Sequence, residues 1–362
     1  MGCEVGMNKR LEWIDVCNGI LIITIVLMHI DFSFWSDNVV GEYIVKLTGL
    51  YKVSIFFCVA GLTLNDKKLK DTWKFIKGKV ENLYVKIVTV GVIAVLLHNV
   101  LIRIGFYQIE LNYSGKVMKT YGIADFFEQI ILSFFMANRE VIIGPMWYAN
   151  VLFMALVILA LQDCFIRFFV KSDNARIVRF VANVGLMLIS SALTNLMEFT
   201  IPRFNNTLTA VFLIDLCQLL YRKLEWKFNN QWAFAISALL LVNLPMYGHL
   251  SMTNNQFLNP AFLFVVAICG MYVLYYISQK VTGGYSKILA FIGKQSFWIM
   301  ALHFTGFKIG SVILNKFIGA NVSSLIPATS DLLCTLFYLF AGIFIPCAIG
   351  VAIEKLKGMI SE

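Results

Sequence analysis

The residues of this sequence best suited to chemistry are two histidines that lie inside long apolar runs. His29 closes a run that begins with the polar residues Asp15 and Asn18, and His303 lies in a second run near the other end of the chain. An ionisable side chain inside a bilayer is costly and by default indicates a function. Imidazole suits proton transfer, because it changes charge near neutral pH. The alternative for His29 is an interfacial side chain that takes no part in a reaction.

The composition is typical of a membrane protein with many spans. The chain has 362 residues, of which 59% are hydrophobic and 14% charged, and its mean hydropathy is +0.77. Inside lipid the backbone must satisfy its own hydrogen bonds, so the apolar runs should be helices, and they are too long for barrel strands. The expected fold class is all-α, a polytopic integral membrane protein whose single domain covers residues 1–362. The net charge of +9 does not indicate nucleic-acid binding, because the basic residues lie in short loops between apolar runs.

About ten runs are long and apolar enough to be candidate spans. They cover residues 14–30, 44–64, 82–104, 145–165, 176–197, 204–222, 231–249, 259–278, 287–309 and 329–354. Lysines and arginines gather in one set of alternate loops, which includes Lys9, Arg10, the loop 65–81 and Lys171, and are sparse in the set that holds Lys116. The positive-inside rule therefore predicts a multi-pass protein of the cell membrane with both termini in the cytoplasm. The first run is expected to be a retained span and not a cleaved signal peptide.

Three further features could contribute to a site. Lys52 lies deep in the second expected span, where snorkelling to the surface explains it poorly. Trp147 opens the fourth span within residues 144–150, although a tryptophan there could also belong to an ordinary aromatic belt. Residues 123–136 are mainly apolar, but the segment is too short and interrupted by too many polar residues to span. We therefore expect an interfacial or re-entrant helix that could cover an outer cavity.

The eight cysteines lack paired spacing and predict neither a metal site nor disulfides.

Three blocks of the sequence resemble the integral-membrane acyltransferase 3 family, especially its fucose O-acetylase-like branch. Their order and spacing over the expected spans carry the resemblance, which covers essentially the whole chain. The blocks are Trp13-Ile14-Asp15 to His29, then Ser54-Ile55-Phe56-Phe57 to Gly61, and then Gly144-Pro145-Met146-Trp147 together with Ser296-Phe297 to His303.

The resemblance implies the transfer of an acyl group, usually acetyl from cytoplasmic acetyl-CoA, to a hydroxyl of a sugar or another envelope molecule. It implies that His29 is essential. We expect His303 to be a second catalytic residue, with Asp15, Asn18, Lys52 and Trp147 in support. The family carries a basic residue where this chain has Asn18, so either the role of that residue is lost or Lys52, Lys86 or another cation replaces it.

The donor site is expected at Lys77 and Lys79, which stand where the family has an arginine-rich cluster before its third span. A lysine can bind a phosphate as a point charge but lacks the guanidinium fork. From charge alone, the lysines of this loop could equally be orientation signals. No metal is expected, and the expected partners are acetyl-CoA, a carbohydrate or lipid-linked sugar acceptor and membrane lipid.

Two other functions fit parts of the pattern. A secondary transporter could use intramembrane His, Asp and Lys residues to carry protons or substrate. A non-catalytic membrane subunit of an envelope-assembly complex is conceivable because Asn18 replaces a basic residue. The absence of an obvious internal repeat and the placement of both histidines toward the outer side weigh against the transporter.

Overall fold

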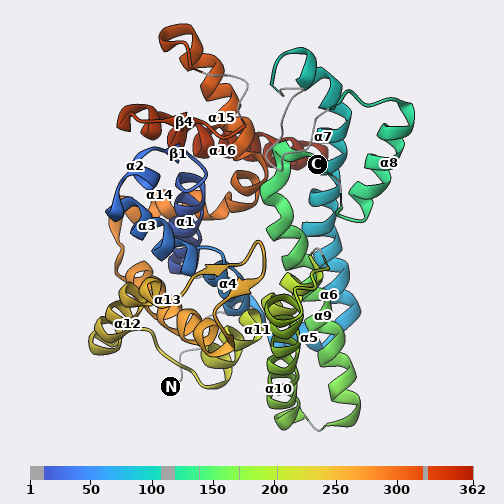
Figure 1. The fold of residues 1–362 in the computed structure, drawn as a ribbon. Helices are drawn as coiled ribbons and strands as arrows, with labels where there is room; N and C mark the ends of the chain where they lie inside the picture. The colour runs from blue at the N-terminus through green and yellow to red at the C-terminus, as the bar shows by residue number, and fades with distance from the viewer. Residues whose placement is uncertain are drawn as a thin grey trace.

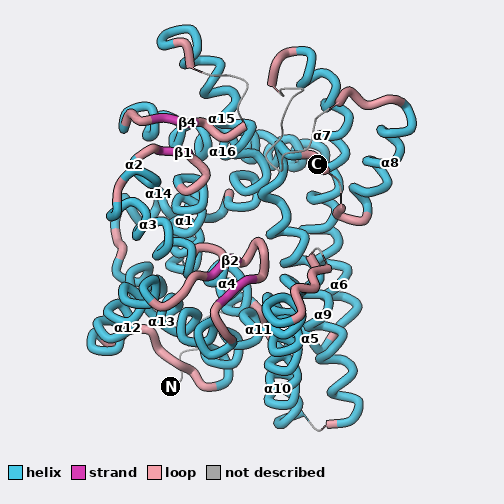
Figure 2. The backbone as a smooth tube through the Cα atoms, viewed as in Figure 1, coloured by secondary structure: helices cyan, strands magenta, loops and turns pink. Residues whose placement is uncertain are grey.

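A computed structural model describes residues 12–106, 119–137, 139–170, 172–201, 203–320 and 325–361. Four of the loop cations that predict the orientation in the membrane lie outside these residues: Lys9, Arg10, Lys116 and Lys171. The described chain is almost entirely helical, as the sequence predicts (Figures 1 and 2). The helices are α1 (Glu12–Leu27), α2 (Phe34–Asp37), α3 (Val39–Tyr51), α4 (Ser54–Thr63), α5 (Asp66–Lys70), α6 (Thr72–Lys79), α7 (Val85–Arg103), α8 (Ile123–Phe134), α9 (Trp147–Phe169), α10 (Ser172–Ser191), α11 (Phe204–Gln218), α12 (Gln231–Asn243), α13 (Pro260–Lys280), α14 (Gly283–Lys294), α15 (Ser296–Ile318) and α16 (Leu332–Ser361).

Short 3₁₀ and π-helical turns join or extend these helices, and four two-residue strands form two pairs. The turns are η1 (Val80–Tyr84), η2 (Val141–Met146), η3 (Ala192–Leu196), η4 (Leu219–Lys223) and η5 (Leu244–Met246). The strand β1 (Asp31–Phe32) pairs in parallel with β4 (Ala328–Thr329), and β2 (Leu250–Ser251) pairs antiparallel with β3 (Gln256–Phe257). β1 follows α1 directly and β4 precedes α16, so this contact ties the first helix to the last.

Seven helical segments in the described part of the chain are long and apolar enough to cross a membrane. They are Val39–Thr63, Thr72–Arg103, Val141–Phe169, Asn174–Leu196, Pro260–Lys280, Ser296–Ile318 and Leu332–Leu356. The remaining expected spans correspond to the shorter helices α1, α11 and α12, so the expected number of about ten is approximate.

One expected span has the wrong bounds. The run 287–309 is divided at Gln295 between α14 and α15, and α15 alone continues to Ile318. α14 packs along α1, and both helices meet at glycines: the backbone oxygen of Leu289 occupies the place of a Cβ on Gly19, and that of Asp15 does so at Gly293. Small residues allow such close approach of two helices. This packing fixes the base of α1 beside the base of α15.

A second break divides the span Val39–Thr63 between α3 and α4. α3 ends at Tyr51 and α4 begins at Ser54, and the Ser54 hydroxyl donates to the Leu50 carbonyl at 2.7 Å across the break. Lys52 is the C-cap of α3 and therefore lies at this break inside the membrane-crossing segment.

α8 confirms the helix expected within residues 123–136. It lies at the edge of the molecule beside α7 (Figure 1), and Ile123, Phe127 and Ile131 present an exposed apolar stripe one helical turn apart. Asp125 caps the helix, and its hydrogen bonds from the Gly122 N–H and from Lys119 hold the pKa of its carboxyl below the ordinary value. An exposed apolar stripe on a short helix suits a membrane interface.

Candidate functional site

The two histidines expected from the sequence lie against each other. The His29 ring, in the turn after α1, is 5.0 Å from the His303 ring of α15, measured between centroids. Phe304 packs against both, at 5.4 Å from His29 and 4.7 Å from His303. His303 is fully buried, whereas His29 is partly exposed. Residues almost 280 positions apart in sequence are thus joined in one apolar, aromatic-walled pair.

Each histidine has one ring nitrogen committed to the backbone. Nδ1 of His29 lies 2.8 Å from the Ile25 carbonyl oxygen, and Nδ1 of His303 lies 2.8 Å from that of Ile299. A carbonyl only accepts, so each Nδ1 carries the proton and donates it. A neutral ring then has its lone pair on Nε2, and Nε2 of His303 has no hydrogen-bond partner among the described residues. Both rings are therefore oriented to accept a proton on Nε2.

Two expected supporting residues belong to the surroundings of this pair. Lys52, at the break between α3 and α4, lies within electrostatic range of His29. Trp147 begins α9 directly after η2, which packs on α15, and a Cβ on Gly144 of η2 would lie 4.0 Å from the Phe304 ring. The segment that ends at Trp147 is thus adjacent to the aromatic wall of the histidine pair.

A cavity of about 670 Å³ lies between α1, α4, α6, α9 and α15. Most of its lining residues are apolar, but polar groups contribute about half of its surface and include three cations, Lys68, Lys79 and Arg222. The other lining residues are Ile14, Asn18, Phe56, Val59, Ala60, Leu62, Thr63, Leu64, Asn65, Phe75, Asn82, Leu83, Tyr148, Ala149, Leu152, Leu156, Ser296, Phe297 and Met300. An apolar wall with a few polar groups is the usual character of a small-molecule site.

Two helices connect the lining of the cavity to the histidines. Asn18 lies on α1, and His29 follows in the turn directly after this helix, eleven residues further along the chain. Met300 precedes His303 by three residues on α15, which places them on one face. The cavity and the histidine pair therefore share α15 and the segment that starts with α1, which makes them candidates for two parts of one site.

The structure separates the two lysines that the sequence proposed for the donor. Lys79 lines the cavity, whereas Lys77 does not; its side chain is 78% exposed, with Nζ 3.9 Å from Glu81. Lys68 and Arg222 line the cavity and were not singled out from the sequence. Arg222 comes from η4, at the end of α11. In the sequence, an arginine at this place is also what the positive-inside rule predicts.

The structure also places the cations that could replace a basic residue at Asn18. Lys52 lies at the break between α3 and α4, within electrostatic range of His29. Lys86 lies over the ring of Phe297, 5.6 Å from its centroid, and Phe297 lines the same cavity as Asn18. Together with Lys79, this puts cations around the cavity that Asn18 faces.

Asp15 is buried at the base of α1, 1% exposed, where its backbone meets Gly293 of α14. Its position fixes the helix that carries Asn18 and His29. Within the described residues, no group of three or more His, Cys, Asp or Glu side chains could hold a metal ion.

Nearly the whole chain, including this site, is similar to one known protein family. Residues 11–351 match the model of a family described as an acyltransferase domain. The chain belongs to the acyltransferase 3 family. The match includes both histidines and every residue that lines the cavity. No curated protein and no solved structure matches the chain at a significant level. Family membership supports a membrane acyltransferase and does not favour a transporter or a non-catalytic subunit.

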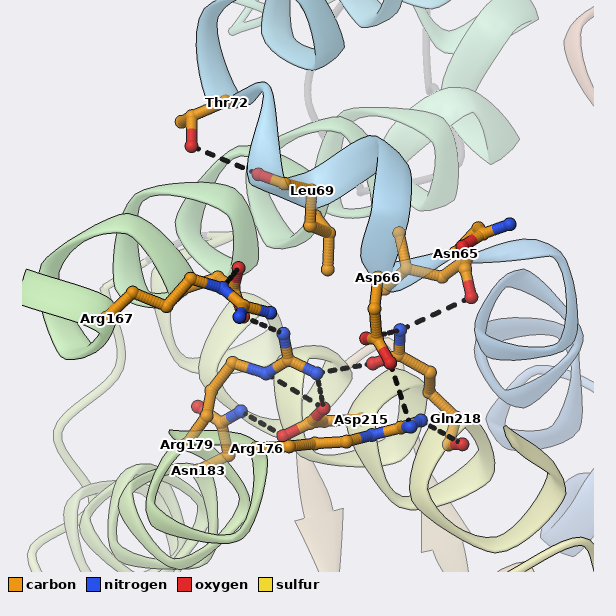
Figure 3. Close-up of polar contacts among 12 residues, drawn as sticks. Asn65, Asp66, Leu69, Thr72, Arg167, Arg176, Arg179, Asn183, Asp215 and Gln218 are labelled. Atoms are coloured by element: carbon orange, nitrogen blue, oxygen red, sulfur yellow. Dashed lines mark hydrogen bonds and ion pairs between the residues drawn. The ribbon is translucent and has the colours of Figure 1, made fainter. Parts of the chain in front are cut away.

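A buried ionic network supports the cavity of this acyltransferase. Figure 3 shows it between α9, α10, α11 and the start of α5. Arg179 is fully buried; its Nη1 is 2.7 Å from Asp163 and its Nη2 is 2.6 Å from Asp215. Arg176 donates to Asp66 at 2.9 Å, and Arg167 donates to Asp163 at 2.6 Å. Three arginines therefore face three aspartates, and the charges of the network balance.

Gln218 connects the network to the cavity. Its side-chain oxygen accepts from Arg179, and its side-chain nitrogen donates to Asp66 at 2.9 Å and to the Leu64 carbonyl at 3.3 Å. Leu64 and Asn65 line the cavity. Arg222, one turn beyond Gln218, donates to the Leu62 carbonyl at 3.1 Å. The network thus fixes the backbone that forms one edge of the cavity.

Proposed function

We propose that this acyltransferase moves an acetyl group from cytoplasmic acetyl-CoA to a hydroxyl of a cell-envelope or exopolysaccharide sugar. One observation supports the proposal: a cavity lined by three cations borders α1 and α15, and the segments that follow from its lining on these helices carry two histidines whose Nε2 atoms can accept a proton. In this proposal the cavity faces the cytoplasm, and the histidines lie toward the outer face of the cell membrane.

The donor end fits the chemistry of a CoA thioester. Its phosphates would bind Lys68, Lys79 and Arg222, and Arg222 supplies the guanidinium fork that lysines lack. Its pantetheine arm would lie along the apolar wall toward Met300, with the thioester directed at the histidine pair. The expected cluster of Lys77 and Lys79 is thereby replaced by cations from three separate elements.

The acceptor end supplies a base. Nε2 of His29 takes the proton of the acceptor hydroxyl as its oxygen attacks the thioester carbonyl. The new C–O bond forms, the C–S bond breaks, and the proton passes to the departing thiolate, which leaves as CoA thiol. Lys52, within electrostatic range of His29, would stabilise negative charge that develops on the carbonyl oxygen. His303 holds the His29 ring by packing and offers a second proton acceptor.

The test uses the purified full-length protein in lipid nanodiscs with radiolabelled acetyl-CoA and candidate sugar acceptors. We expect thiol release that matches ester formation and falls at least about 100-fold in His29→Ala. Mass spectrometry of surface glycans from a deletion strain would identify the acceptor that loses acetyl groups. Acetyl transfer by a folded His29→Ala variant at the parent rate would exclude His29 as the base.

A further inference from the structure

Arg203 and Trp147 form a pair that the reaction described above does not use. Arg203 directly precedes α11, and its guanidinium carbon lies 5.9 Å from the centroid of the Trp147 ring. This is a cation–π contact. The Arg203 side chain is partly exposed, so a ligand can reach it.

The guanidinium of Arg203 has no carboxylate within ion-pair distance among the described residues. Arg167, Arg176 and Arg179 are each paired with an aspartate. Arg203 therefore keeps its charge and its hydrogen-bond donors available.

The surrounding backbone holds this arginine in a fixed and unusual position. Its φ of 68° and ψ of −28° lie in the left-handed region, which is costly for a residue with a long side chain. The Arg203 carbonyl accepts from the backbone N–H of Thr207 at 3.0 Å and from its hydroxyl at 2.6 Å. Asn206, further into the same turn, donates to the Met252 carbonyl at 2.6 Å.

In the sequence, Trp147 lies between residues that line the donor cavity and a residue that faces the wall of the histidine pair. Trp147 is followed by Tyr148 and Ala149, which line the donor cavity. It is preceded by Gly144, which faces the Phe304 ring beside both histidines. A group held by Arg203 over Trp147 would therefore be close to the reacting hydroxyl.

We propose that Arg203 and Trp147 bind an anionic group, a carboxylate or a phosphate, carried by the hydroxyl acceptor. This rests on the proposed function and defines its substrate class as acidic acceptors. The planar guanidinium matches the oxygens of either anion, and the indole face gives the sugar ring an apolar surface. A carboxylate would come from an acidic sugar, and a phosphate from a lipid-linked carrier.

The first test measures binding without catalysis. Phenylglyoxal modifies arginines of the protein in nanodiscs, and mass spectrometry gives the rate at Arg203. We expect methyl glucuronoside or inorganic phosphate to slow this rate and neutral methyl glucoside to leave it unchanged at equal ionic strength. The exposed Arg139 serves as the control, because its side chain is 67% exposed. Equal rates at Arg203 with and without the anions would overturn the proposal.

The second test compares acceptors in the transfer assay. Arg203→Gln should raise KM about tenfold for an acidic acceptor, the loss expected for one charge-assisted contact, and leave KM for acetyl-CoA unchanged. Methyl glucuronoside and polyprenyl-phosphate-linked glucose separate the two sources of the anion, and methyl glucoside is the neutral reference. Arg139→Gln is the matched control and should change none of these constants. An equal change in KM for charged and neutral acceptors would contradict an anion site.

The two tests also separate this proposal from the proposed function. Protection of Arg203 in a protein that releases no thiol from acetyl-CoA would retain the anion site and reject the acetyl transfer. Thiol release without protection of Arg203, and without a selective rise in KM for acidic acceptors in Arg203→Gln, would retain the acetyl transfer and reject the anion site.

Discussion

At the scale of single residues, a carbonyl one turn earlier orients each histidine. The Ile25 and Ile299 carbonyls take the Nδ1 protons of His29 and His303, which leaves Nε2 as the basic atom of each ring. His98 differs, because Glu140 lies 3.0 Å from its Nδ1 and the Lys119 carbonyl lies 3.0 Å from its Nε2. Both of its nitrogens are engaged, so it fastens α7 to the segment that holds α8.

This difference gives a matched pair of variants. His303→Gln removes the ring that packs on His29 and the second Nε2, so kcat should fall about 100-fold with little change in KM for acetyl-CoA. His98→Gln should leave kcat nearly unchanged and lower thermal stability, because it breaks a buried contact with Glu140. Steady-state kinetics and thermal unfolding of both variants check this. Equal losses of kcat in the two would place His303 outside the reaction.

The two lysines expected at the acetyl-CoA site give a second pair of variants to compare. Lys79→Gln should raise KM for acetyl-CoA about tenfold, because it removes a cation from the cavity lining. Lys77→Gln should leave KM unchanged, because Lys77 is exposed and outside the lining. Each variant removes one positive charge from the same helix, α6. If both raise KM equally, general attraction of the anionic donor explains the effect better than a cavity contact.

Sequence reasoning found part of this site. His29, His303 and Trp147 are candidates from the sequence because each belongs to one of the blocks that resemble the family, and Lys79 because it stands where the family has a basic cluster. Arg222 could not, because an arginine at a span edge is also what the positive-inside rule requires. Only the fold, which brings η4 beside the end of α4, distinguishes a cation of the cavity from an arginine that merely orients the chain in the membrane.

At the scale of helices, the ionic network determines how α9, α10 and α11 pack. Asp215 of α11 accepts from Arg179 at 2.6 Å and from Asn183 at 2.7 Å, both on α10. Removing one partner of a buried ion pair leaves the other charge uncompensated. Each helix of this trio therefore depends on charges carried by the others.

We expect Asp215→Asn to destabilise the folded protein by about 3 kcal/mol, because Arg179 keeps its charge and loses one of two aspartates. Thermal unfolding in detergent would show the shift. Asp31→Asn is the control, because Asp31 is exposed and should change stability little. Equal stability of both variants would mean that water reaches Arg179 in the folded protein.

The helices themselves could largely be predicted, and their interruptions could not. Hydropathy detects long apolar runs, so the positions of most expected spans agree with helices. The breaks at Lys52 and Gln295 lower the hydropathy only locally, and the segment Val39–Thr63 remains apolar enough on average to be one span. Their positions depend on how α4 and α15 pack against neighbouring helices.

At the scale of the whole molecule, the orientation in the membrane decides which substrate meets which end of the site. The predicted orientation places both termini and the cavity in the cytoplasm. A fluorescent reporter fused after Glu362 should be active there, and a periplasmic reporter inserted between α7 and α8 should be active outside. An outer C-terminus would put the cavity on the side that lacks acetyl-CoA.

The network also has a consequence for how the chain enters the membrane during synthesis. α10 brings Arg176 and Arg179 into the first two turns of a candidate span. An unpaired arginine adds about 2.5 to 3.5 kcal/mol to insertion at a span centre, and snorkelling lowers this cost near a span end. Asp66 and Asp163 precede α10 in the chain, so they are already present when it emerges, whereas Asp215 arrives later with α11. The insertion machinery would therefore receive α10 with some of its counter-charges in place, and α11 would complete the set. Biogenesis of this region then proceeds by groups of helices and not one helix at a time.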